Sequence, residues 1–131
     1  MPTLRSKILI VDDESDIVNL TSSWLHLQNY ETISCHSGDE ALQVIQDRHN
    51  EICLVLLDIM MPILSGYEVL EEIKKHEEYK DILVVLFSVK NFQLDIQKAK
   101  ELGADGYLPK AISGKELLNY VKNILKKSEV N

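Results

Sequence analysis

The feature that most constrains this chain is a strict alternation between strand-like and helix-like segments. Three segments are unbroken apolar runs rich in Ile, Val and Leu, namely Ile8–Val11, Ile52–Leu57 and Ile82–Phe87. Such runs are typical of a parallel sheet with helices on both faces. Thr32–His36 instead alternates apolar and polar residues, which suits a half-exposed edge strand. A fifth, short strand is predicted around Tyr107 and Leu108, where Pro109 indicates a second edge.

Amphipathic segments lie between the predicted strands. One apolar stripe comprises Ile17, Leu20, Trp24 and Leu27, and another comprises Leu117, Val121 and Ile124. The stripe places Trp24 in the core rather than at a ligand. Three predicted helices begin with a serine followed three residues later by a glutamate, the pattern of a capping box: Ser37 with Glu40, Ser65 with Glu68, and Ser113 with Glu116. Gly103 follows Leu102 at the position of a helix-ending glycine.

Five consecutive βα units predict an α/β fold with a doubly wound parallel sheet. Right-handed crossovers between successive strands give three interior strands and two edge strands. The chain has 131 residues, of which 45% are hydrophobic, so we expect one domain over residues 1–131 with a core of about 6–127. We expect no output domain in this chain.

Charge, cysteine content and hydropathy exclude several classes of protein. A net charge of −7 argues against direct binding to nucleic acid or to an anionic membrane surface. The two cysteines, Cys35 and Cys53, are too few and too far apart for a zinc site or a CxxC motif, and their apolar surroundings predict buried free thiols. No apolar stretch reaches the roughly 20 residues of a membrane-spanning helix. We therefore expect a cytoplasmic protein without membrane insertion.

Polar residues follow four of the predicted strands. They are Asp12, Asp13 and Glu14 after the first strand, Asp58 after the third, Ser88 after the fourth and Lys110 after the fifth. Sites in such sheets form at the carboxyl ends of the strands, so these side chains should converge. Converging carboxylates repel one another unless a cation holds them, and oxygen ligands favour Mg²⁺. Helix capping by acidic loops is the alternative, but it does not explain an aspartate behind six apolar residues.

These residues belong to motifs that resemble the receiver domain of two-component response regulators. The motifs are VDDE (Val11–Glu14), LLDIMMP (Leu56–Pro62), Gly66, the Phe87–Ser88 pair and GADGYLPK (Gly103–Lys110). The resemblance covers nearly the whole chain, and the ordered set is far more specific than any single motif. It implies a CheY-like, flavodoxin-like (βα)5 fold with strand order 2-1-3-4-5, with two helices on one face and three on the other.

The resemblance also implies a role for each site residue. Asp58 is the expected phosphoacceptor, with Lys110 and Ser88 contacting the phosphoryl oxygens. Mg²⁺, for which Mn²⁺ could substitute, would be held by Asp13, Asp58 and the backbone carbonyl of Met60, with Asp12 acting through water. Ser88 and Tyr107 would form the switch. Phosphoryl transfer needs positioning and charge neutralisation, which an ammonium and a divalent cation supply.

The implied function is a regulatory switch that catalyses only its own phosphorylation and dephosphorylation. The phosphoryl group would come from a phosphohistidine of a histidine kinase or histidine phosphotransfer protein. The phosphorylated form would act on a downstream protein, or form a homodimer, through the fourth helix, fifth strand and fifth helix. Phe92, Leu94 and Ile96 lie near the start of that fourth helix, and one helix face cannot bury all three. The exposed one is either part of a docking surface or an ordinary partly exposed apolar residue.

Two positions depart from the family pattern. Ala111 follows the lysine where the family usually has proline in a cis peptide, so we expect a trans bond between Lys110 and Ala111. Val89 follows Ser88 where a small residue is usual, and its branched side chain could hinder Tyr107. Met60 and Lys90 occupy variable positions that tune the phosphoryl lifetime in the family.

Three other functions are compatible with this fold class. A pseudo-receiver would share the fold without responding to phosphate, but the complete set of site residues argues against it. A phosphohydrolase with an aspartyl nucleophile would carry a second aspartate at the position of Met60. An FMN carrier would need a hydroxyl- and glycine-rich loop after the first strand, where the acidic DDES segment would repel phosphate.

Overall fold

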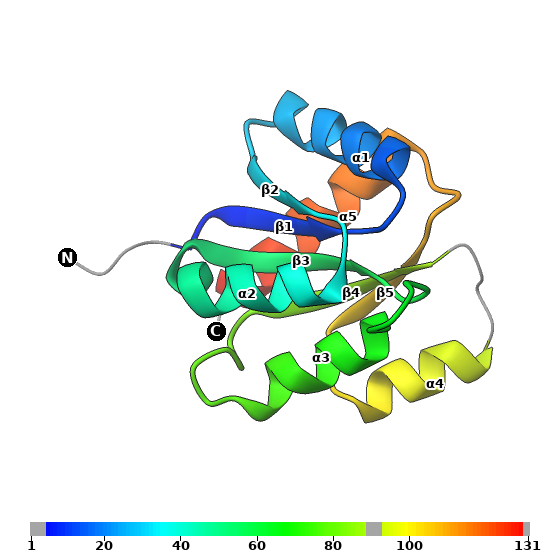
Figure 1. Cartoon of the computed structure of the whole chain (residues 1–131). Coiled ribbons are helices and arrows are strands. Elements are labelled where there is room, and N and C mark those ends of the chain that lie inside the picture. Colours follow the sequence, from blue (N-terminus) through cyan, green and yellow to red (C-terminus); the bar gives the residue numbers. More distant parts are fainter. Residues whose placement is uncertain (1–4, 89–92, 130–131) are drawn as a thin grey trace.

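The structure, a computed structural model, describes residues 5–88 and 93–129. Its centre is a parallel five-stranded sheet in the order β2-β1-β3-β4-β5, as predicted (Figure 1). The strands are β1 (Lys7–Val11), β2 (Glu31–Cys35), β3 (Ile52–Asp58), β4 (Leu83–Ser88) and β5 (Gly106–Pro109). The expected edge strands, β2 and β5, do lie at the two edges.

Within the described residues, one α-helix follows each strand, and these five helices cover both faces of the sheet. They are α1 (Ser15–Leu27), α2 (Gly38–Arg48), α3 (Gly66–Lys75), α4 (Gln93–Glu101) and α5 (Gly114–Glu129), and a short 3-10 helix, η1 (His49–Glu51), precedes β3. The helices α1 and α5 pack on one face, and α2, α3 and α4 pack on the other (Figure 1). This two-against-three arrangement confirms the fold that the sequence predicts.

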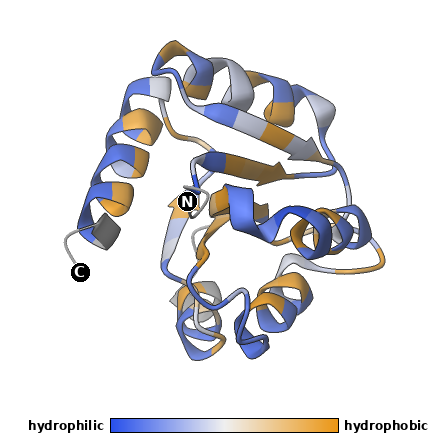
Figure 2. Cartoon of the chain, turned by 90° about the vertical axis from the view of Figure 1, so that its left-hand side faces the viewer, coloured by the Kyte–Doolittle hydropathy of each residue, from blue (hydrophilic) through white to orange (hydrophobic). Residues whose placement is uncertain are grey.

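The sheet separates two hydrophobic cores, and successive residues of each inner strand face opposite cores. In β3, Val55 and Leu57 join the core under α2, α3 and α4, whereas Leu54 and Leu56 join the core under α1 and α5. Full burial on both faces explains why these strands read as unbroken apolar runs. Figure 2 shows helices that carry both hydrophilic and hydrophobic residues, as expected where one side of a helix faces a core.

The predicted helix starts form, with one difference. Ser65 and Glu68 make a complete capping box, and Ser113 and Glu116 make the same reciprocal pair. At α2 the Ser37 hydroxyl accepts from the amide of Glu40, but the Glu40 carboxylate accepts from the amide of His36 instead of Ser37. The expected capping box is therefore wrong at this helix, because the glutamate side chain reaches one residue farther back.

The end of α4 confirms the expected role of Gly103. Its φ of 93° is left-handed, and the amide of Ala104 donates to the carbonyl of Ala99 at 2.9 Å. This 6→1 bond satisfies a carbonyl at the helix end, as in a Schellman motif.

The apolar stripe predicted for α1 is partly wrong. Val18 and Leu25 are buried, whereas Leu20 and Leu27 are exposed. The buried face of α1 is shifted by about one residue from the predicted stripe. The row from Val18 to Leu25 faces the sheet, and Leu20 and Leu27 lie at the border of that face. Trp24 packs against the core as predicted, and its indole covers Gly114 at the start of α5.

Other expectations have mixed outcomes. Neither Cys35 nor Cys53 is in a disulfide; Cys35 is buried and Cys53 is half-buried. No helix within residues 5–88 and 93–129 has the length and hydropathy needed to cross a membrane. The expectations about Val89, Lys90 and Phe92 fall outside the described residues, as do those that concern the side chain of Leu94.

Candidate functional site

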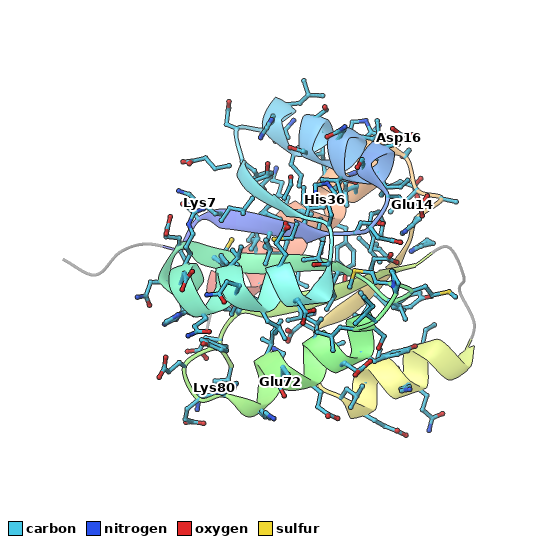
Figure 3. The ribbon with its side chains drawn as sticks, viewed as in Figure 1. Lys7, Glu14, Asp16, His36, Glu72 and Lys80 are labelled. Atoms are coloured by element: carbon cyan, nitrogen blue, oxygen red, sulfur yellow. The ribbon has the colours of Figure 1, made fainter. Side chains whose placement is uncertain are left out.

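The polar residues at the ends of β1, β3 and β5 converge. We call this side of the sheet, where the carboxyl ends of the parallel strands lie, the carboxyl edge. Asp12 directly follows β1, Asp58 is the last residue of β3, and Lys110 directly follows β5. β3 lies between β1 and β4, and this strand order brings the ends of separate βα units together. Figure 3 shows Glu14 and Asp16 at this same edge, where the chain turns from β1 into α1.

Lys110 is the centre of the site. Its ammonium lies 2.7 Å from Asp12 Oδ2, 3.3 Å from Asp58 Oδ1 and 3.3 Å from Glu14 Oε1. Its side chain is only 6% exposed, and those of Asp12 and Asp58 are 2% and 3% exposed. The expected approach of Lys110 to Asp58 is present, but its shortest ion pair is with Asp12.

The Asp58 carboxylate is satisfied on one oxygen only. Oδ1 accepts from the amide of Met60 at 3.3 Å and faces the Lys110 ammonium. Oδ2 is buried and accepts no hydrogen bond from any described residue. A buried carboxylate oxygen without a donor is costly, so this oxygen calls for a cation or another ligand.

Burial and neighbouring charge act on the two central groups in a defined direction. Burial, helped by repulsion from Asp12, raises the pKa of Asp58 from 3.8 to about 7, against the attraction of Lys110. Burial alone would lower the pKa of Lys110, but its hydrogen bond to Asp12 and its attraction to Asp58 outweigh burial and raise that pKa. The ammonium therefore stays charged while Asp58 is held at the margin of ionisation.

The acidic residues at this edge fit a divalent metal site. Asp12, Asp13 and Asp58 each offer a carboxylate oxygen, and these oxygens lie within 4.8 Å of one another. Two of the residues are buried and Asp13 is exposed, so the cluster has an open side. Oxygen-only ligands suit a hard cation, and the unpaired Asp58 Oδ2 provides a buried position for one.

Gly66 holds the start of α3 against the end of β3. Its amide donates to the carbonyl of Ile59 at 2.9 Å. A Cβ atom on Gly66 would collide with the backbone carbonyl of Asp58 and lie 2.7 Å from the Cα of Ile59. Only glycine fits this contact, which explains its place in the motif.

The loop from β3 to α3 contains a strained residue that the sequence does not reveal. Ile63 has a φ of 69°, and the amide of Leu64 donates to the carbonyl of Pro62 at 2.8 Å across it, which closes a γ-turn. Ile63 is 95% exposed and the neighbouring Met60 is 59% exposed. A branched side chain with positive φ is unusual, and no glycine or asparagine marks this turn in the sequence.

The remaining predicted residues are placed less completely. Ser88 ends β4 beside Pro109 of β5, but its side chain is outside the described part of the chain. Tyr107 is half-buried in β5 and packs against the core under α4. The bond between Lys110 and Ala111 is trans, as expected. Sequence reasoning placed Glu14 at this edge but missed its ion pair with Lys110, for which no motif gives a signal.

Comparison with known proteins finds one family that the chain resembles along most of its length. The family model described as "Response regulator receiver domain" matches residues 8–122. The chain is 37% identical over 123 residues to the transcriptional regulatory protein CpxR homolog of Haemophilus influenzae, covering 94% of this chain and 52% of that protein. It is 36% identical over 118 residues to the response regulator SaeR of Staphylococcus aureus, covering 90% and 50%. The chain thus spans about half the length of these curated relatives.

Solved structures show the same fold. A CheY-like response regulator receiver domain protein from Methanospirillum hungatei superposes with a TM-score of 0.87 at 27% identity, over 95% of this chain and 97% of that one. The receiver domain of DrrB, in a structure described as BeF3-activated, has a TM-score of 0.81 at 30% identity, over 94% and 99%.

Proposed function

Because the chain belongs to the response regulator receiver family of two-component signalling, we propose that it is a phosphorylation-dependent switch whose acceptor is Asp58. The observation that carries this proposal is the environment of Asp58 Oδ2. That oxygen is buried and without a donor among the described residues, while the other oxygen of the same carboxylate faces the Lys110 ammonium. This leaves one oxygen of the carboxylate open to a cation or to the phosphorus atom.

The proposed reaction moves a phosphoryl group from a phosphohistidine of a partner protein to Asp58. A new bond forms between an Asp58 carboxylate oxygen and phosphorus, and the bond between phosphorus and the imidazole nitrogen breaks. The imidazole keeps the electron pair of that bond and takes up a proton. Attack of water on the resulting acyl phosphate would release inorganic phosphate and restore the Asp58 carboxylate.

The acidic cluster supports a role for a divalent cation, for which we propose Mg²⁺, with Mn²⁺ as a substitute. Asp13 and Asp58 would hold it with the carbonyl of Met60, and Asp12 would act through water. When bound, the cation neutralises charge on the phosphoryl oxygens. Asp12 also anchors the Lys110 ammonium at 2.7 Å, so the same carboxylate orders both sources of positive charge.

Lys110 and Ser88 would carry the signal away from the acceptor. A phosphoryl group on Asp58 adds negative charge and acceptor oxygens, which attract the ammonium of Lys110 and the hydroxyl of Ser88. Both residues sit at the ends of the paired strands β4 and β5, and Tyr107 lies in β5. We propose that Tyr107 responds by changing rotamer and so alters the surface of α4, β5 and α5.

That surface would contact a downstream protein or a second copy of the chain. The phosphoryl donor would be a histidine kinase or a histidine phosphotransfer protein, and the domain would act in the cytoplasm. The domain would not bind nucleic acid directly, and it would not act on a metabolite. Its chemistry would be limited to its own phosphorylation and dephosphorylation.

Phosphorylation of the purified chain by acetyl phosphate or phosphoramidate, with and without Mg²⁺, tests this proposal. Intact-mass spectrometry should show one added phosphoryl group that requires Mg²⁺, and Asp58→Asn should abolish the addition. Asp47→Asn is the matched control, because Asp47 is an exposed helical aspartate on α2. Failure of the wild-type chain to take up a phosphoryl group would favour a pseudo-receiver instead.

A further inference from the structure

The Lys110 ammonium has one more carboxylate partner than the proposed reaction needs. Asp12 and Asp58 hold it from inside the site, and Glu14 Oε1 approaches it from the solvent side at 3.3 Å. Glu14 is 60% exposed, unlike the two buried aspartates. Its side chain makes no other ion pair or hydrogen bond among the described residues, so Lys110 alone sets its position.

The backbone position of Glu14 also calls for an explanation. Glu14 is the N-cap residue of α1, with extended backbone angles, and its side chain makes no capping hydrogen bond. Serine, threonine, aspartate or asparagine would cap this helix. The backbone amide of Glu14 donates to Asp12 Oδ1 at 3.0 Å, which fixes the residue beside the site and directs its long side chain toward Lys110.

We propose that Glu14 is a positioning residue that holds Lys110 at the mouth of the site and competes with the incoming phosphoryl group for it. This inference rests on the proposed function. An ammonium has three N–H donors, and three carboxylates face them here. A phosphoryl oxygen that enters from solvent must therefore displace one of them, and Glu14 is the exposed one. Glu14 thereby sets how readily Lys110 turns to the phosphoryl group.

The exposure of Glu14 limits the size of this effect. Ion pairs with an exposed partner are weak and screened by salt, whereas the buried pair with Asp12 is screened much less. Loss of the Glu14 contact should therefore speed phosphorylation by about two- to five-fold at low salt. The acceleration should shrink at high salt, because screening already weakens the contact in the wild-type chain.

Two substitutions separate the contact from the charge. Glu14→Gln removes the charge. Glu14→Asp keeps the charge but shortens the side chain, and an aspartate at the N-cap turns to the free amides of α1 instead of Lys110. Asp16→Asn is the matched control, because Asp16 is an exposed acid in the first turn of the same helix and makes no ion pair within the described residues. Figure 3 shows Glu14 and Asp16 at the same end of the molecule.

The experiment measures the rate of phosphoryl uptake from acetyl phosphate by intact mass, at saturating Mg²⁺ and at low and high salt. We expect both Glu14 variants to be faster than wild type at low salt, Asp16→Asn to match wild type, and Glu14→Asp to have a raised thermal midpoint. A wild-type rate in Glu14→Asp, or equal acceleration by Asp16→Asn, would mean that only charge at the mouth matters and would overturn the inference. Equal rates in all four proteins would also overturn it while leaving the proposed function intact. No uptake by wild type would overturn both.

Discussion

The sheet carries a charged cluster at each end of its strands: the amino edge, where the strands begin, and the carboxyl edge, where they end. The two clusters differ in whether their charges balance. At the amino edge, Lys7 lies 3.4 Å from Glu31 and 3.2 Å from Glu51, and Arg48 lies 3.0 Å from Glu51. Each of these four charges has a partner of opposite sign. At the carboxyl edge, one ammonium faces several carboxylates. Figure 3 shows the two edges at opposite ends of the molecule, marked by Lys7 and Glu14.

The pKa values of two carboxyl groups, one at each edge, show the difference. Hydrogen bonds from Arg48 and Lys7 lower the pKa of Glu51 from 4.5 to about 2. Burial and repulsion raise the pKa of Asp58 from 3.8 to about 7. The amino edge therefore favours the ionised acid, whereas the carboxyl edge disfavours it. A cluster whose charges are balanced contributes to stability, and a cluster left unbalanced is available for chemistry.

The backbone shows the same contrast. Asn29 follows α1 with a φ of 65°, and asparagine tolerates this left-handed region. Ile63 has nearly the same φ, 69°, in the loop beside Asp58. A branched residue in that region is strained, and its exposed side chain gains no packing in return. Strain and unbalanced charge thus lie at the same edge.

The largest effect that would test this comparison comes from Asp58→Asn. We expect it to abolish phosphoryl uptake and, in Mg²⁺-free buffer at pH 8, to raise the free energy of unfolding by on the order of 1–3 kcal/mol. The gain arises because an uncharged amide replaces a buried carboxylate that is repelled by Asp12. Urea denaturation measures it. A variant less stable than wild type under these conditions would contradict the idea that the carboxyl edge is electrostatically unfavourable.

The second test uses pH, since the two edges should respond with opposite sign. The pKa of Asp58 is higher in the folded chain than in the unfolded chain, so its contribution to stability is complete below about pH 4 and lost as pH rises through about 7. The pKa of Glu51 is lower in the folded chain, so its contribution is present above about pH 4.5 and lost as pH falls through about 2.

Urea denaturation of the wild type, Asp58→Asn and Glu51→Gln from pH 2 to pH 8 without divalent cations measures both contributions. The stability difference between Asp58→Asn and wild type should grow as pH rises, and Mg²⁺ should reduce it by stabilising only the wild-type site. A difference that stays constant over this range would show that Asp58 titrates like an ordinary aspartate. The sheet edges would then not differ in the way proposed.

A smaller effect is expected from the strained loop. Ile63→Asn should raise the free energy of unfolding by about 1 kcal/mol, because asparagine accepts a positive φ and the exposed isoleucine gives up little packing. Ile63→Val is the matched control and should give no gain, since valine is also branched. Thermal and urea denaturation measure both variants. Equal stability of Asn and Val at this position would show that the turn is not strained.

The smallest effect should come from Glu51→Gln at the amino edge. The variant loses its ion pairs with Lys7 and Arg48, which are partly exposed and screened, so we expect a slight decrease in the urea midpoint near neutral pH. Phosphoryl uptake should equal that of wild type, because the change lies at the other end of the sheet. A slower uptake would mean that the two edges are coupled.

The sequence predicted the fold well because the physical rule behind it is local. Unbroken apolar runs predict strands covered on both faces, and right-handed crossovers fix which ends of the strands meet. Asp12, Asp58 and Lys110 therefore converge as expected. Gly66 and Gly103 also have the backbone roles that their motifs predict.

The sequence did not predict details that depend on how far a side chain reaches. The capping partner of Glu40, the exposed positions of Leu20 and Leu27, and the contact between Glu14 and Lys110 all follow from side-chain placement in the packed molecule. The φ of Ile63 is missed for another reason: the residue type contradicts the conformation. Sequence rules fail there because the fold imposes a turn that the local residues do not favour.

The alternation of β3 between two cores has a consequence for how this chain can change. Leu54 and Leu56 face one core, and Val55 and Leu57 face the other. Inserting or deleting one residue would exchange the side chains that face the two cores and would turn the Asp58 carboxylate to the opposite face of the sheet. The length of this strand is thus constrained by packing on both of its faces at once.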